Sequence, residues 1–172
     1  MEEDLPKDFN IVGLYNRLEN YLKEYNSSYY ENTFSTHLKE YNFAVLLEVS
    51  QRLETLADFP VLSECFYQEP EVDTALLLSE KMGIADLTHA KEALQFGLDV
   101  IKTFNSTPSR DALKDAMIPK IAEAGKKNGQ ILWPLRVALT GKEFSPGAFE
   151  MIEILGVEKA IARIERVIAR LV

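Results

Sequence analysis

The spacing of its apolar residues constrains this 172-residue chain more than any other feature. Apolar residues recur every three or four positions, as with Leu18 and Leu22 or Leu94 and Leu98. This spacing places side chains on one face of an α-helix, and no segment alternates convincingly at the period of two typical of a strand. The eight glycines are few and stand at plausible helix ends. The sequence therefore predicts an all-α fold.

In the first part of the chain, Thr36 is expected to cap a long helix. Its inner face would carry Leu38 and, further along, Val45 and Val49. This helix should end before Pro60, because proline lacks a backbone donor and restricts the residue before it.

The middle of the chain predicts two more helices. The first covers residues 73–82 and is closed by Gly83 in the left-handed conformation. The second begins at Asp86 or Thr88 and runs to about Phe104.

A polar run containing proline, residues 105–109, is the one convincing linker. Residues 1–104 carry 8 Lys/Arg and 19 Asp/Glu, a balance of −11, whereas residues 105–172 carry 11 and 8, a balance of +3. We therefore expect two helical subdomains: an acidic N-terminal helical bundle, 1–104, and a C-terminal helical cage, 109–172. A locally basic surface suits a phosphate backbone even in an acidic chain, although chance produces such asymmetry too.

The C-terminal part predicts four shorter helices. Ser109 is expected to cap the first, which ends at Gly125 and is kinked or split by Pro119. The second, residues 131–140, ends at Gly141.

The third helix is expected to have Ser145 as its cap and Pro146 at its first position, and to stop at Gly156. The last begins near Val157 with its isoleucines inward, and its arginines, Arg163 among them, are expected on its surface.

Residues with catalytic or metal-binding potential are few and scattered. No Gly-rich phosphate loop, His-Glu-x-x-His pair or Gly-x-Ser-x-Gly elbow occurs. His37 and His89 stand apart, and Cys65 is the single cysteine. We predict no catalytic residue, no metal site and no cofactor in this chain. Trp133 has apolar neighbours, which favours the core over base stacking.

No apolar stretch approaches the roughly 20 residues of a membrane-spanning helix. The first four residues, MEED, are acidic, unlike the start of a signal peptide. A soluble protein of the cytoplasm, with no membrane partner, is the expectation.

Two segments carry a family resemblance. Residues 133–143 (WPLRVALTGKE), continued by 145–149 (SPGAF), 152–156 (IEILG) and 161–164 (IARI), closely resemble the final domain of bacterial-type glutamyl-tRNA synthetases. Residues 49–56 (VSQRLETL) more loosely resemble the helical domain that precedes it.

The resemblance implies the C-terminal, anticodon-binding part of a class I aminoacyl-tRNA synthetase. The family attaches glutamate to tRNA with ATP, and its catalytic domain precedes two helical domains. This chain has neither the His-x-Gly-His nor the Lys-Met-Ser-Lys-Ser signature. ATP and magnesium would therefore belong to a catalytic domain absent from it, and an excised fragment is favoured over a stand-alone paralogue.

The resemblance also implies which residues contact RNA. Arg136 matches the arginine that the family places against an anticodon base. Ser145, Pro146, Ala148 and Phe149 match the loop-to-helix junction that holds unstacked bases, with Phe149 either a stacking face or a helix anchor.

Phosphate contacts are expected of Lys126, Lys127 and Lys142. Arg52 is a weaker RNA candidate. Without the resemblance, Arg136 would instead be expected to pair with Glu143 or Glu150 and orient helices.

The partner implied is a glutamate tRNA, bound through its anticodon loop by a monomer, with no DNA partner. The alternatives are a free-standing RNA-binding module, a helical adaptor that binds another protein, and another class I synthetase such as the lysine enzyme.

Overall fold

The structure of the chain is a computed structural model that describes residues 10–171. Within that range every regular element is a helix, apart from one isolated bridge between Ser79 and Ile84. The all-α prediction is therefore confirmed. The acidic start of the chain, residues 1–4, lies outside the described range. No described helix is both long and apolar enough to cross a membrane.

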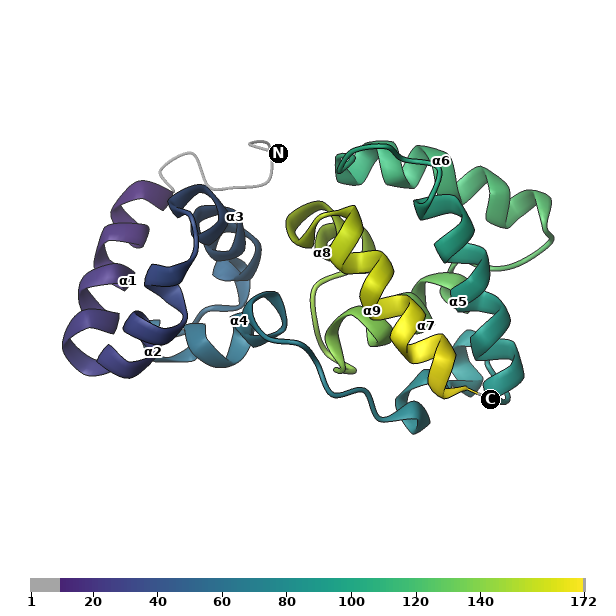
Figure 1. The fold of residues 1–172 in the computed structure, drawn as a ribbon, viewed down its shortest axis with the longest axis horizontal. Coiled ribbons are helices and arrows are strands. Elements are labelled where there is room, and N and C mark those ends of the chain that lie inside the picture. Colours follow the sequence, from purple (N-terminus) through teal and green to yellow (C-terminus); the bar gives the residue numbers. More distant parts are fainter. Residues whose placement is uncertain (1–9, 172) are drawn as a thin grey trace. The chain divides into compact units, whose positions relative to one another are not determined.

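The chain divides into two compact units, Met1–Glu64 and Cys65–Val172. The helices of the first unit are drawn in purple and blue in Figure 1. They are α1 (Ile11–Tyr25), α2 (Ser27–Asn32), α3 (Lys39–Val49) and the beginning of α4 (Phe59–Tyr67), with 3-10 turns η1 (Phe34–Thr36), η2 (Ser50–Arg52) and η3 (Leu56–Asp58).

Aromatic side chains fill the core of the first unit. Phe34 and Phe59 are almost completely buried, and their rings meet edge to face with centroids 5.8 Å apart. Tyr15 packs on Phe34 at 5.6 Å. Burying a phenylalanine contributes about 1.5–3 kcal/mol, so these rings supply much of this unit's stability.

The long helix predicted before Pro60 is shorter than expected. α3 ends at Val49, and Leu38, predicted on its inner face, is 76% exposed because it is the extended residue before the helix. Pro60 does not follow a helix but stands in the first turn of α4, where its missing N–H costs nothing.

The second unit contains the remaining elements, drawn from teal to yellow in Figure 1. They are η4 (Thr74–Leu77), η5 (Glu80–Met82), α5 (Leu87–Ile101), α6 (Arg110–Glu123), α7 (Asn128–Thr140), α8 (Ala148–Leu155) and α9 (Val157–Arg170). The helix predicted over residues 73–82 is thus two 3-10 turns, although Gly83 does close the second at φ +76°.

Of the two starts predicted for α5, Asp86 and Thr88, the structure has Asp86 as the N-cap, and the cap predicted for α6 is confirmed. The carboxylate of Asp86 accepts from His89 N, and the hydroxyl of Ser109 accepts from Ala112 N. α6 is not split at Pro119, because that residue lies on the exposed side, where water reaches the carbonyl that proline leaves unpaired.

Three helices, α5, α7 and α9, pack on one another to form the core of the second unit. α5 and α7 approach closely at Gly97, where an added Cβ would lie 2.5 Å from Leu135 Cδ1. Glycine is therefore required by contact at this point of the helix, despite its low helix propensity. Because α5 packs on α7 in this way, it is part of the same compact unit as the C-terminal helices.

The structural division lies earlier than the predicted boundary. The sequence placed it at the linker 105–109, whereas the compact units meet at residues 64–65, inside α4. The linker is an exposed connection between α5 and α6 within one unit. Composition marked a loop correctly, but it carried no information on which helices pack together.

Arg163 is a second correction. It was predicted on the surface of the last helix, yet it is 4% exposed. Its guanidinium donates to three backbone carbonyls, of Cys65 (2.7 Å), Leu139 (2.6 Å) and Gln68 (2.8 Å). A buried charge is tolerated when hydrogen bonds replace its hydration, as they do here.

Candidate nucleic-acid interface

The best-matching segment of the sequence forms the end of α7, the α7–α8 loop (residues 141–147) and the start of α8. The loop begins at Gly141, which has φ +67°. An added Cβ there would lie 2.4 Å from the backbone oxygen of Glu71. Gly141 is therefore fixed both by its left-handed backbone and by the close approach of another backbone segment.

The side chain of Thr140 links the last turn of α7 to the α7–α8 loop. Its side chain is buried, and its hydroxyl lies 2.8 Å from Arg136 O, 3.1 Å from Ser145 Oγ and 3.2 Å from Lys142 N. A hydroxyl donates one hydrogen bond and accepts others, so it can serve the carbonyl of α7 and the loop together. This contact holds both ends of the loop to the last turn of α7.

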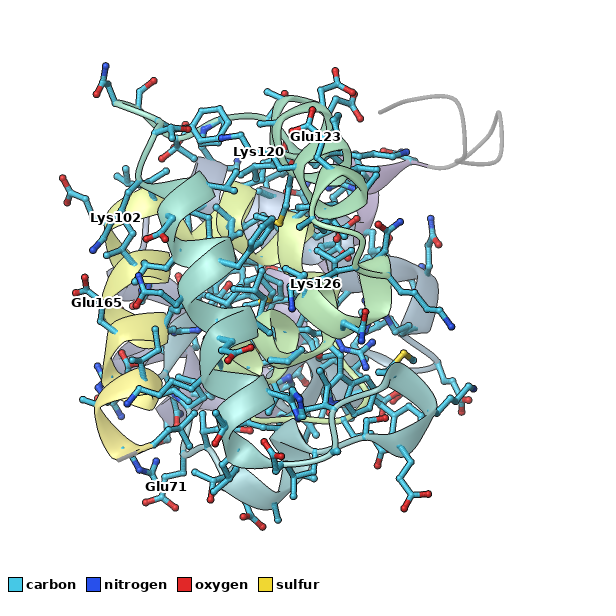
Figure 2. The ribbon with its side chains drawn as sticks, turned by 90° about the vertical axis from the view of Figure 1, so that its right-hand side faces the viewer. Glu71, Lys102, Lys120, Glu123, Lys126 and Glu165 are labelled. Carbon is cyan, nitrogen blue, oxygen red and sulfur yellow. The ribbon has the colours of Figure 1, made fainter. Side chains whose placement is uncertain are left out.

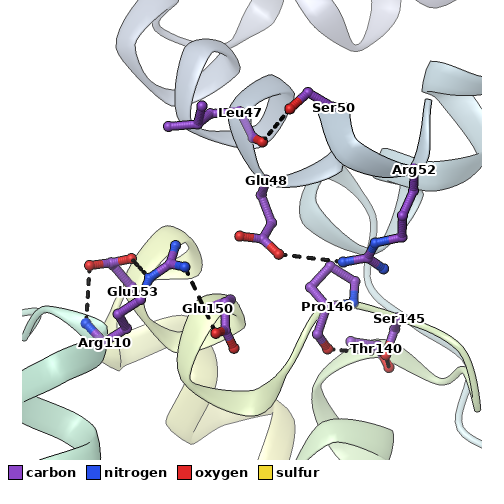
Figure 3. Close-up of polar contacts among 10 residues, drawn as sticks. All are labelled: Leu47, Glu48, Ser50, Arg52, Arg110, Thr140, Ser145, Pro146, Glu150 and Glu153. Carbon is purple, nitrogen blue, oxygen red and sulfur yellow. Dashed lines mark hydrogen bonds and ion pairs between the residues drawn. The ribbon is translucent and has the colours of Figure 1, made fainter. Parts of the chain in front are cut away.

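The start of α8 differs from the prediction. Ser145 and Pro146 do not begin the helix, because α8 starts at Ala148 with Gly147 as its N-cap. The hydroxyl of Ser145 faces Thr140 instead, and Pro146 is buried (Figure 3). Its ring anchors the loop rather than opening a helix.

Of the other residues matched to the junction, Ala148 is buried and Phe149 is half-buried. Both therefore serve the packing of α8. The carboxylate of Glu150 lies beside Gly147, where an added Cβ would meet Oε2 at 2.3 Å, so a side chain at this N-cap would displace that carboxylate.

Arg136 lies on α7 one turn before Thr140. Its guanidinium carbon is 4.7 Å from the centroid of the Trp133 ring, a cation–π contact. Trp133 is half-buried, and its Nε1 donates to the backbone oxygen of Leu76 at 2.9 Å. The tryptophan predicted in the core therefore lies at its edge, where one side of it meets the arginine.

Glu150, one of the two acids considered as partners of Arg136, lies beside another arginine. Arg110 Nη1 is 3.8 Å from Glu150 Oε1, and Arg110 Nε donates to Glu153 at 2.9 Å (Figure 3). Backbone N–H of Arg110 also donates to Glu153. These contacts fix the start of α6 on α8.

Phe144 was not anticipated from the sequence. It lies within the α7–α8 loop and is 87% exposed, more than any other large apolar side chain of the described residues. The signal in the sequence is an aromatic residue in a short loop, whereas the family resemblance points to Phe149 instead.

The predicted phosphate contacts occupy two places. Lys126 and Lys127 are exposed at the connection between α6 and α7, with Gly125 at φ +66° turning the chain before them. In Figure 2, Lys126 is seen below Lys120 and Glu123 of α6. Lys142 belongs instead to the α7–α8 loop and is half-buried.

Arg52 lies in the first compact unit, in the 3-10 turn after α3. Its Nη2 is 3.4 Å from Glu48 Oε1, one helical turn earlier (Figure 3). The side chain of Arg52 is 41% exposed and that of Glu48 is 12% exposed. This contact neither supports nor contradicts an RNA-binding role for Arg52, which stays a prediction.

Two further observations concern other chemistry. Among residues 10–171, no three His, Cys, Asp or Glu side chains gather in a way that could hold a metal ion. The pKa of Asp86 is lowered, chiefly by the hydrogen bond from the backbone N–H of His89, which is the signature of a helix cap.

A family model described as "Anticodon binding domain" matches residues 13–168, so the chain belongs to the anticodon-binding domain family.

Individual relatives are glutamate–tRNA ligases. That of Lachnoclostridium phytofermentans is 36% identical over 126 residues, which cover 72% of this chain and 25% of the relative. That of Clostridium kluyveri is 32% identical over 154 residues, 87% of this chain and 31% of the relative. The chain thus spans less than a third of the length of these relatives.

A solved structure confirms the fold. The crystal structure of a glutamate tRNA ligase from Elizabethkingia meningosepticum in complex with its amino acid superposes with a TM-score of 0.73. The match covers 95% of this chain and 30% of that one, at 19% sequence identity. The family model and the relatives agree with the resemblance found in residues 133–164, and the solved structure shows the same fold.

Proposed function

We propose that this chain binds the anticodon loop of a glutamate tRNA, as the anticodon-reading part of a glutamate–tRNA ligase. The observation that carries the proposal is the family match over residues 13–168, together with relatives that are glutamate–tRNA ligases. On this proposal, glutamate, ATP and magnesium are handled by a catalytic part outside the chain.

Arg136 would read one base. An arginine presents a planar fork of donors that matches the acceptor edge of a base, and the Trp133 ring supports that fork. A single-stranded loop suits such recognition because its bases are splayed and their edges are accessible.

Phe144 would provide a stacking face for an unpaired base. Its ring is 87% exposed on a loop whose backbone is held at Thr140 and Gly141, so a base can reach the ring. The aromatic rings of Trp133 and Phe149 are both partly covered by the protein. The stacking role therefore passes from Phe149, the residue matched in the sequence, to Phe144.

Lys126, Lys127 and Lys142 would contact phosphates and supply affinity without sequence preference. Arg52 is retained as a further RNA contact. Ser145, Pro146 and Ala148 would act by shaping the loop and through their backbone groups, because their side chains are engaged or buried.

The test is binding of the purified chain to a glutamate tRNA and to the same tRNA with only its anticodon changed, at low and moderate salt. The glutamate tRNA should bind more tightly. Arg136→Ala should reduce that preference, whereas Lys127→Ala should weaken binding of both tRNAs alike. Equal binding of both tRNAs by the unaltered chain would refute anticodon reading.

A monomeric state, a preference for RNA over DNA and a place in the cytoplasm remain part of the proposal. Sedimentation of the chain alone and competition with a DNA hairpin of the same sequence test the first two. A free-standing RNA-binding module is the alternative, and reading the gene upstream for a catalytic domain separates the two.

A further inference from the structure

Trp133 and Arg136 stand one turn apart on α7 and are linked to a third point in the fold. The indole N–H of Trp133 donates to Leu76 O at 2.9 Å, and the face of its ring lies 4.7 Å from the guanidinium carbon of Arg136. We propose that Trp133 is a positioning residue that holds the guanidinium of Arg136 in the plane needed to read an anticodon base. The inference rests on the proposed function.

The indole is held at a fixed place. Its N–H is the one polar group of the side chain, and it is used by Leu76 O. Leu76 lies in η4, a turn capped by Asp73, whose carboxylate accepts from Ala75 N at 2.9 Å, and anchored by Leu77, which is completely buried. The carbonyl that fixes the indole is thus itself fixed by the fold.

The guanidinium is held in turn by the indole. Arg136 is half-buried, and its Nε is fully buried. A long arginine side chain loses rotamer entropy when it is fixed in one conformation, which base recognition must otherwise overcome. Contact with the ring restricts the guanidinium before RNA arrives, and orientation is what a two-pronged contact to a base edge requires.

The segment that carries Leu76 therefore acquires a role in recognition. It is remote in sequence from α7 and shows no RNA-binding signature of its own. A change in η4 would be transmitted through one hydrogen bond to the indole and through one ring contact to the arginine.

The chemical test compares Trp133→Phe and Trp133→Leu. Phenylalanine keeps an aromatic face but loses the N–H, and leucine loses both. We expect the preference for the glutamate anticodon to fall about 2- to 30-fold with Trp133→Leu, the range given by a cation–π contact of 0.5–2 kcal/mol. Trp133→Phe should recover part of the preference, and the tRNA with a changed anticodon should bind each variant as it binds the unaltered chain.

A double-mutant cycle with Arg136→Ala gives the decisive comparison. If Trp133 acts through Arg136, then Trp133→Leu changes the anticodon preference in the unaltered chain but not in the Arg136→Ala background. An equal change in both backgrounds, or equal weakening toward both tRNAs, would overturn the inference.

An NMR measurement without RNA keeps the two proposals separable. The Arg136 Nε–H signal should be shifted by the ring current of Trp133 and should return toward the position of a free arginine in Trp133→Leu. An unshifted signal in the unaltered chain would overturn the positioning role whatever the RNA result. Absence of any anticodon preference, with the ring-current shift present, would overturn the proposed function and the recognition role of Trp133 with it.

Discussion

Replacing Arg163 by methionine is the perturbation whose cost the structure defines most fully. The guanidinium donates to the carbonyls of Cys65, Gln68 and Leu139, and its Nε lies 3.5 Å from Glu69 Oε1. Methionine has a similar length and fills the space, so the change removes the donors with little loss of packing.

The magnitude follows from the carbonyls left behind. A hydrogen bond from a charged donor contributes about 1.5–3 kcal/mol, which gives roughly 4–9 kcal/mol for three. Gln68 is exposed, so water can replace the donor at its carbonyl, whereas the bonds to Cys65 and Leu139 are buried. We therefore expect Arg163→Met to lower the free energy of unfolding by about 3–5 kcal/mol.

The matched control is Arg166→Met on the same helix. Arg166 also pairs with Glu69, but its side chain is 48% exposed, so its loss should cost less than about 1 kcal/mol. Urea denaturation followed by the fluorescence of the single tryptophan, Trp133, reports on the unit that contains both arginines. Equal destabilisation by the two variants would refute the reading of Arg163 as a buried anchor for carbonyls.

Three other predictions concern the loop and the first unit. Gly141→Ala should lower the free energy of unfolding, measured in urea, more than Gly125→Ala does. Both glycines have positive φ, which costs an alanine about 1–2 kcal/mol. Only at Gly141 would the added Cβ also meet a backbone oxygen, because nothing lies within 4 Å at Gly125. Phe144→Ala should leave the melting temperature unchanged, because the ring is 87% exposed, yet weaken binding of the glutamate tRNA about 5- to 150-fold if a base stacks there. Burial raises the pKa of Tyr29 to about 12. The stability that its neutral form gives is therefore present below pH 10 and is lost as the pH rises toward 12, by up to about 1.4 kcal/mol per pH unit. Tyr29→Phe should flatten that fall in stability when denaturation is measured across this pH range.

Each of these three predictions can be contradicted by one measured result. Equal losses in the two glycine variants would show that the α7–α8 loop yields to a Cβ without cost. Unchanged tRNA affinity in Phe144→Ala, with the fold intact, would remove the stacking face. A fall in stability above pH 10 that persists unchanged in Tyr29→Phe would assign it to other groups.

Local signals in the sequence predicted local structure well. Ser109 caps the helix that it was expected to cap, and Asp86 is one of the two residues expected to start α5. Gly83 takes the left-handed conformation predicted for it, and Gly141 ends α7 as expected. These features depend on a side chain and the few residues next to it, so their physics is contained in a short segment.

Features set by distant contacts could not be predicted in this way. Arg163 stands at a position where helical spacing allows a surface residue, and only the approach of residues 65–68 and 139 turns it inward. Ser145 has the sequence of a helix cap, but its hydroxyl bonds to Thr140 and the helix begins at Ala148. The boundary at 64–65 likewise follows from packing of α5 on α7, which composition does not record.

The residues of the candidate site also differ in whether the sequence alone could identify them. Arg136 and the lysines were found from the resemblance, and they remain predictions as RNA contacts. Phe144 and the link from Leu76 through Trp133 to Arg136 required coordinates, because exposure of one ring and contact of another depend on the folded neighbours of each.

The most direct test of anticodon reading uses RNA that contains nothing else. The chain would be titrated with an isolated anticodon stem–loop of a glutamate tRNA and with stem–loops changed at each anticodon base in turn, at fixed salt. Preference for the unaltered loop, diminished at one base by Arg136→Ala, is the expected result. Equal affinity for all the loops would contradict the claim that this helical unit reads the anticodon.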